Sequence, residues 1–170
     1  MIRVSNGDLE ALSCLFEKFH VRIFNFSYRM IGNKELSEDI TQEVFYHLIR
    51  YKKTYNGSSF STWIYTIARN IIYKEYRNKK PLINNIADMS VLLIDNAQSH
   101  NDEIEHLEAC LKKLSFEDRE IIILNKIEGV KYQELSVIMK TSTGALKTKS
   151  HRAMKKLKEF YFNQKRDEIL

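Results

Sequence analysis

Apolar residues in this sequence recur in alternating steps of three and four, which is the spacing of one face of an α-helix. The longest run lies near the start of the chain, at Leu9, Leu12, Phe16, Phe19, Ile23, Phe26 and Met30. Only one proline and five glycines occur among the 170 residues, so few positions interrupt a helix. The sequence therefore predicts an all-α protein built from amphipathic helices.

The helices are predicted to form two groups separated by a linker. Ser5 and Asp8 are spaced as a capping box for the first helix, and further helices are expected over 34–51 and from Phe60 to about residue 80. Pro81 opens a stretch without sustained periodicity, apart from a short helical turn at 90–94. We therefore predict a first domain over residues 1–80, a flexible linker over 81–101 and a second domain over 102–170.

The second domain has the pattern of a helix-turn-helix. A helix with a stripe at Ile104, Leu107, Leu111 and Leu114 is expected first. A second helix follows, which the Ser115–Asp118 capping box introduces and Gly129 ends. Helices over 131–139 and 142–160 are then separated by only a few residues. A short helix, a tight turn and a longer basic helix are typical of this motif.

Positive charge is concentrated in the last helix. The net charge of the chain is only +5, so the placement of the charges matters more than their sum. The basic residues of the last segment are Lys140, Lys147, Lys149, Arg152, Lys155, Lys156 and Lys158, whereas residues 88–108 are acidic. This asymmetry favours a polyanionic partner for the basic helix, with a merely solvated helix face as the alternative.

Signals of catalysis, cofactor binding or membrane insertion are missing from the sequence. The five histidines form no i, i+4 pair, and we expect none to lie beside a cysteine as a metal ligand. There is no GxGxxG, Walker-type or GxSxG motif. No apolar run approaches the roughly 20 residues that span a bilayer, and no signal peptide is evident. We expect no enzymatic activity, no cofactor, no metal, no small-molecule substrate and no direct membrane insertion.

Two helices carry candidate DNA-binding faces. The N-terminal turns of the second helix of a helix-turn-helix enter the major groove. Here those turns offer Thr143, Lys147, Thr148, Lys149, His151 and Arg152, while Leu146, Ala153 and Leu157 are expected to point inward. The helix that begins near Phe60 mixes aromatic rings with cations and an amide, at Trp63, Tyr65, Arg69, Asn70, Tyr73, Lys74 and Arg77.

Rings and cations on one helix suit an unpaired nucleic-acid strand, because rings stack on bases while cations hold the backbone. The preceding loop, with Tyr55, Asn56, Ser58 and Ser59, could form the wall of a pocket for an extruded base. The alternative is that Trp63 and the tyrosines pack the core.

Three segments resemble conserved regions of RNA polymerase sigma factors. Residues 39–45 (DITQEVF) resemble the hallmark of the second region, and residues 60–70 (FSTWIYTIARN) resemble the segment that melts promoters and reads the minus-ten element. Residues 128–135 (EGVKYQEL) with 142–149 (STGALKTK) resemble the fourth region, which reads the minus-thirty-five element. The short linker and the lack of further domains are similar to the extracytoplasmic-function (ECF) subgroup.

The resemblance implies a cytoplasmic transcription factor with core RNA polymerase, promoter DNA and an anti-sigma protein as partners. It assigns Asp39, Gln42 and Glu43 to core-polymerase binding. It assigns the minus-ten element to Tyr55, Asn56, Trp63, Arg69, Asn70, Tyr73, Lys74 and Arg77. The last helix, with its candidates from Thr143 to Arg152, is assigned to the minus-thirty-five element. Lys149 departs from the pattern, since an arginine is common there and lysine lacks its bidentate fork.

Three other functions remain compatible with the residues alone. A stand-alone helix-turn-helix regulator would bind duplex operators as a dimer, and would leave the face around Asp39 without a role. A helical adaptor would carry its basic helix incidentally. A helical enzyme would need a pocket of polar groups assembled in space.

Overall fold

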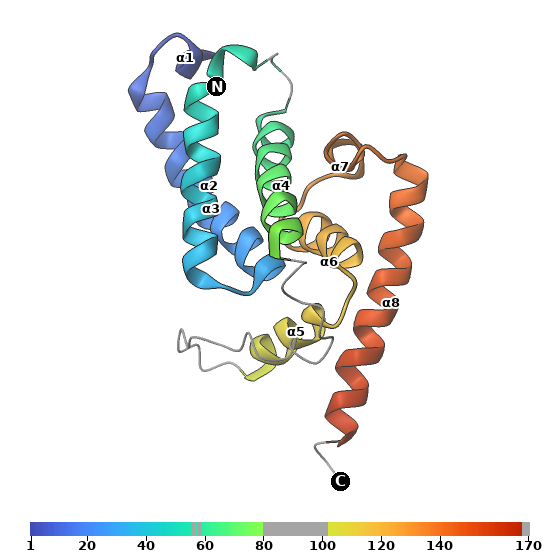
Figure 1. Cartoon of the computed structure of the whole chain (residues 1–170). Coiled ribbons are helices and arrows are strands. Elements are labelled where there is room, and N and C mark those ends of the chain that lie inside the picture. The colour runs from blue at the N-terminus through green and yellow to red at the C-terminus, as the bar shows by residue number, and fades with distance from the viewer. Residues whose placement is uncertain (56, 58, 80–101, 168–170) are drawn as a thin grey trace. The chain divides into compact units, whose positions relative to one another are not determined.

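The computed structural model describes residues 1–55, 57, 59–79 and 102–167 (Figure 1), and all regular structure in these ranges is helical. The chain divides into two compact units, Met1–Asp95 and Asn96–Leu170. The prediction of an all-α protein with two small helical domains is thus confirmed. The predicted linker over 81–101, including the helical turn at 90–94, lies outside the described residues.

Three long helices form the first unit. Its elements are α1 (Ile2–Ser5), α2 (Leu9–Ile31), α3 (Lys34–Arg50), the 3-10 turn η1 (Lys52–Thr54) and α4 (Phe60–Lys79). Helices α2, α3 and α4 pack against one another in every pairing (Figure 1). Their stripes supply a core that includes Ile23, Phe26, Ile40, Val44, Leu48, Ile64 and Ala68. Each large side chain of this kind contributes roughly 1.5–3 kcal/mol through removal from water.

The start of α2 differs from the prediction. Ser5 is the last residue of α1, so it cannot cap α2, and the expected Ser5–Asp8 capping box is wrong. Asp8 itself is the N-cap, and its Oδ1 accepts a hydrogen bond of 2.9 Å from the Ala11 amide. That amide, together with the Arg3 guanidinium at 2.7 Å, holds the pKa of the Asp8 carboxyl below its usual range.

The second unit consists of α5 (Asp102–Lys112), α6 (Phe116–Ile122), the π-helical segment η4 (Ile123–Ile127), α7 (Tyr132–Met139) and α8 (Thr143–Asp167). Helix α8 packs against α5, α6 and α7, and its Leu146, Ala153 and Leu157 are buried as predicted. It extends beyond the expected residue 160 to Asp167. Helices α7 and α8 with their short turn form the predicted helix-turn-helix (Figure 1).

The helix that Ser115 caps does not continue as a regular α-helix to Glu128. It widens in η4, where the Glu128 amide donates to the Ile123 carbonyl oxygen, five residues back, at 2.9 Å. Gly129 then turns the chain with φ 71°, a left-handed conformation that favours glycine. The turn between α7 and α8 uses Lys140 in a similar conformation, with φ 52°.

Arg119 joins α6 to the end of α5. Its guanidinium donates to three carbonyl oxygens: Leu111 at 3.0 Å, Lys112 at 2.6 Å and Leu114 at 3.3 Å. These oxygens belong to the last turn of α5 and the turn after it, where a helix leaves carbonyls without internal partners. Arg119 is only 8% exposed, so few water molecules could donate to these carbonyl oxygens in its place.

We expect Arg119→Met to destabilise the second unit by roughly 2–3 kcal/mol, because buried carbonyl oxygens lose charged donors. Arg119→Lys should rescue little, since an ammonium cannot reproduce the planar fork. Urea unfolding followed by circular dichroism measures the loss. The single tryptophan, Trp63, lies in the first unit and its fluorescence serves as an internal control. An unchanged dichroism transition in Arg119→Met would contradict this role.

Candidate nucleic-acid interface

The outer face of α4 gathers most of the polar side chains that sequence reasoning selected. At about 100° per residue, Trp63, Asn70, Lys74 and Arg77 fall on one stripe, opposite the core positions Ile64, Ala68 and Ile72. Asn70, Lys74 and Arg77 are exposed, whereas Trp63 is half-buried. The helix thus presents one ring, one amide and two cations along a single line.

Arg69 and Tyr73 form a second pair on the neighbouring flank of α4. The Arg69 guanidinium carbon lies 4.3 Å from the centroid of the Tyr73 ring, a cation–π contact that orients both groups. Arg77 Nε approaches the Tyr73 carbonyl oxygen at 3.4 Å. Tyr65 belongs elsewhere: it is fully buried, with its ring 5.7 Å from Phe26. The expectation that Tyr65 joins the binding face is therefore wrong, and its role is in the core.

The loop before α4 is tied to the helix by aromatic contacts. Tyr55 meets Trp63 edge-on, with ring centroids 5.3 Å apart, and Phe60 lies 6.2 Å from Trp63. Both Tyr55 and Trp63 are half-buried, so the indole packs the fold and still shows part of its ring. Asn56 and Ser58, which the sequence also selects for this loop, lie outside the described residues.

The acidic face of α3 lies beside the cationic face of α4. Asp39 and Gln42 are exposed and lie off the buried stripe, as the helical spacing predicts. Glu43 is half-buried between two partners: Lys74 Nζ approaches its Oε1 at 3.5 Å and His47 Nε2 at 3.7 Å. The structure therefore brings together Glu43, assigned to polymerase, and Lys74, assigned to DNA.

In the second unit, the outer face of α8 carries four of the six predicted residues. Lys147, Thr148, His151 and Arg152 are exposed and project away from the buried positions of this helix. Thr143 is half-buried at the start of the helix. Sequence reasoning did not select Lys155 for this face, although it is exposed and follows His151 by one helical turn. The spacing of four residues between His151 and Lys155 would have identified Lys155 from the sequence.

Lys149 is turned toward α6. Its Nζ lies 2.6 Å from Glu117 Oε1, and Lys156 pairs in the same way with Asp118 at 2.9 Å. Both acids lie in the first turn of α6, where negative charge is also favoured by the helix dipole. Two lysines of the basic helix thus have partners within the protein, which leaves the opposite flank to bind other groups.

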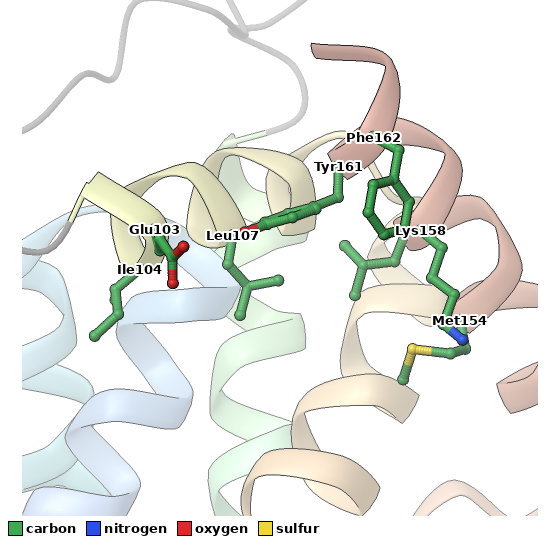
Figure 2. A pocket seen from close by; sticks show the side chains of 8 residues that line it. Glu103, Ile104, Leu107, Met154, Lys158, Tyr161 and Phe162 are labelled. Carbon is green, nitrogen blue, oxygen red and sulfur yellow. The ribbon is translucent and has the colours of Figure 1, made fainter. Parts of the chain in front are cut away.

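An apolar groove of about 410 Å³ lies between α5 and the C-terminal half of α8. Figure 2 shows its walls, with Tyr161 reaching from α8 toward α5. Ile104 and Leu107, which the sequence assigns to a buried stripe, line this groove and are 46% and 38% exposed. Its charged residues, Glu103 and Lys158, form no converging set of catalytic groups in the part of the chain that the structure describes.

The expectation that no histidine is spaced from a cysteine as a metal ligand is wrong for His106 and Cys110, which are four residues apart on α5. Cys110 Sγ lies 3.9 Å from His106 Nε2, one helical turn away. The same Nε2 donates to the Tyr161 carbonyl oxygen at 3.0 Å, because a carbonyl can only accept. Burial raises the pKa of the Cys110 thiol, which disfavours the thiolate. The hydrogen bond from His106 to Tyr161 is the contact that joins α5 to α8. No cluster of three metal-ligating side chains occurs among the described residues.

No helix within the described ranges combines the length and the apolar character needed to cross a membrane.

Comparison with protein families finds a match on each unit. The model of Sigma-70 region 2 matches residues 15–81, and the model of Sigma-70, region 4 matches residues 104–157. Together they cover more than half of the chain. The first match includes the acidic face of α3 and the outer face of α4, and the second includes the helix-turn-helix.

Similar proteins extend over nearly the whole chain. RNA polymerase sigma factor CarQ of Myxococcus xanthus is 29% identical over 163 residues, which cover 94% of this chain and 94% of CarQ. ECF RNA polymerase sigma factor SigX of Bacillus subtilis is 26% identical over 161 residues, covering 88% and 83%.

Two solved structures share the fold. The first is the sigma factor RpoE in complex with the anti-sigma factor NepR from Bartonella quintana, with TM-score 0.75, 22% identity and coverage of 89% of this chain and 96% of that chain. The second is CnrH in complex with the cytosolic domain of CnrY, with TM-score 0.73, 19% identity and coverage of 93% and 92%.

Proposed function

The chain belongs to the extracytoplasmic-function family of RNA polymerase sigma factors, and we propose that it binds core RNA polymerase and directs it to particular promoters. Sigma factors are transcription initiation factors, and we propose that this one works in the cytoplasm and catalyses no reaction of its own. The observation that carries the proposal is that two separately folded units each have an exposed surface suited to a different partner. Each presents one cationic helix face, on α4 and on α8, and α3 adds an acidic face.

The acidic face of α3 is the proposed site for polymerase. Asp39 and Gln42 are exposed, and Glu43 is held by an ion pair with Lys74 at 3.5 Å and by a contact with the His47 ring at 3.7 Å. Exposed pairs of this kind contribute at most about 1 kcal/mol, so a cationic surface of the polymerase can replace them. Binding there would release Lys74 from Glu43 at the moment when DNA is brought to α4.

The outer face of α4 is the proposed site for the melted minus-ten strand. Tyr55 and Trp63 offer ring surface to an unstacked base, while Asn70, Lys74 and Arg77 continue along the helix as donors to the strand. Stacking of a base on an aromatic ring contributes roughly 1–3 kcal/mol. The protein therefore assists melting by holding bases that have left the duplex, without chemistry.

Helix α8 is the proposed reader of the minus-thirty-five duplex. Thr143 and the exposed Lys147, Thr148, His151 and Arg152 belong to the first three turns of the second helix of a helix-turn-helix. These turns are the part that enters the major groove. The region 2 domain, proposed over 1–80, and the region 4 domain, proposed over 102–170, act together on one promoter. Two weak readers joined by a tether of about 20 residues gain effective concentration once polymerase holds both.

Regulation by an anti-sigma protein is part of the proposal. The similar structure of RpoE contains the anti-sigma factor NepR. We propose that a protein of this kind covers the polymerase-binding or DNA-binding faces of the present chain until it is displaced.

Replacing Asn70 and Arg77 by alanine should impair open-complex formation more than core binding. Each residue lies on the outer face of α4 and supports no core contact, so we expect a loss of roughly tenfold or more in melted promoter, as charged hydrogen bonds contribute about 1.5–3 kcal/mol. Permanganate footprinting measures melting, and titration with labelled core measures binding. Equal losses in both assays would show that this helix face is misassigned.

Lys147 and Lys149 should respond differently to substitution. Lys147→Gln should reduce the slope of log affinity against log salt for duplex promoter DNA by about one, as one phosphate contact is lost. Lys149→Gln should change the slope much less, because its ammonium is paired with Glu117 at 2.6 Å. The two variants remove the same charge from the same helix, so each controls for the other. Equal changes in slope would mean that Lys149 leaves Glu117 to reach the DNA.

Run-off transcription with purified core polymerase on genomic fragments tests the whole proposal. We expect the chain to confer transcription from a subset of fragments that core alone does not transcribe. A pull-down with core decides between this function and a stand-alone helix-turn-helix regulator, which would bind duplex DNA but not core. Failure of both start-site selection and core binding would refute the proposal.

A further inference from the structure

A row of aromatic rings leads from the minus-ten loop to α2. Tyr55 contacts Trp63, Trp63 lies near Phe60, and Phe60 meets Phe19 of α2 with ring centroids 5.0 Å apart. A second ring contact, between Phe26 and Tyr65, joins the same two helices farther along. The order of these contacts shows that α2 and α4 run side by side in the same direction. The N-terminal half of α4 therefore has α2 as a neighbour along its length.

Helix α2 carries two cations at the end of this row. Lys18 Nζ lies 5.8 Å from the centroid of the Phe19 ring, and the Arg22 guanidinium carbon lies 5.5 Å from it. Phe19 is only 5% exposed and separates these cations from Phe60 by a single ring. Lys18 is exposed and Arg22 is half-buried.

The cations of α2 are separated from its acids around the helix. At about 100° per residue, Lys18, Arg22, Asn25 and Arg29 fall on one stripe, with spacings of four, three and four. The two acidic residues of α2, Glu10 and Glu17, project roughly 80–100° away from that stripe. The stripe is therefore cationic along three turns.

We propose that Lys18 and Arg22 extend the DNA-binding surface of the first unit from α4 onto α2, where they contact phosphates of the melted strand next to the minus-ten element. The inference rests on the proposed role of α4 in holding that strand. Surfaces that bind single strands combine stacked rings with cations that follow the backbone. The ring contacts from Tyr55 to Phe19 connect the loop to Lys18 and Arg22 on α2. These two cations would bind the part of the strand that lies beyond the loop.

A purely structural role for these cations makes a different prediction. A cation–π contact with Phe19 would stabilise α2 and would not depend on DNA. A phosphate contact on a single strand contributes about 0.7 to the slope of log affinity against log salt. The salt slope therefore separates the two roles, because a packing contact leaves it unchanged.

The experiment uses holoenzyme assembled from the full chain and core polymerase. The probe is a fluorescent single strand from the melted region of a promoter found by run-off transcription. One form contains the minus-ten element alone, and two others are extended by several nucleotides on either side. We expect Lys18→Gln to lower the slope by about 0.7 on one extended strand and to leave it unchanged on the short strand. Lys18→Arg should restore the slope, and Arg22→Gln should act like Lys18→Gln.

Lys34→Gln is the matched control, since this exposed lysine begins α3, a helix whose other end leads to the loop. Its 17 residues place Lys34 roughly 25 Å from that end, so its loss should leave unchanged the slope on the strand that responds to Lys18→Gln. An unchanged slope in Lys18→Gln on all strands, while Asn70→Ala and Arg77→Ala still weaken binding, would overturn this inference and leave the proposed function standing. Loss of strand binding in none of these variants would overturn both.

Discussion

The long helices α2, α3, α4 and α8 each carry an apolar stripe, and that stripe determines both what the helix packs against and what it leaves exposed. Helix α4 buries Ile64 and Ala68, so Asn70 and Arg77 are left on the opposite side. Helix α8 buries Leu146 and turns its basic residues outward in the same way. Because the core uses only one face of these long helices, side chains on the other face can change with little effect on stability.

Ion pairs within each unit restrain the charges that face partners. Lys74 is paired with Glu43, and Lys149 with Glu117, between helices that already pack together. Such exposed pairs are weak and are screened by salt, so they orient a side chain but do not prevent it from binding another group. Lys74 lies 3.5 Å from Glu43, so a phosphate backbone can replace this partner. Lys149 lies only 2.6 Å from Glu117 and stays with it, so its charge contributes mainly to packing between α6 and α8.

The helices and most buried positions were predictable, because spacings of three and four depend only on the helix itself. The spacing does not predict which other helix each part of an apolar stripe will pack against. Phe16 is 47% exposed despite its place in the longest apolar run, and Ile104 and Leu107 line a groove. The turn of Lys149 toward Glu117, 32 residues away, depends on tertiary packing and had no local signal. The contacts of Phe19 with Phe60 were hidden for the same reason.

The π-helical segment Ile123–Ile127 accommodates one residue more per turn than an α-helix would at the same length. Helices with this widening differ from regular ones by a single inserted residue. Removing one residue there would return the segment to a regular α-helix, so Gly129 and the helices after it would keep their orientation. Removing one residue from the regular helix α7 would instead rotate the rest of that helix by about 100°. A length change of one residue in η4 is therefore compatible with the direction in which α8 presents its basic side, whereas the same change in α7 is not.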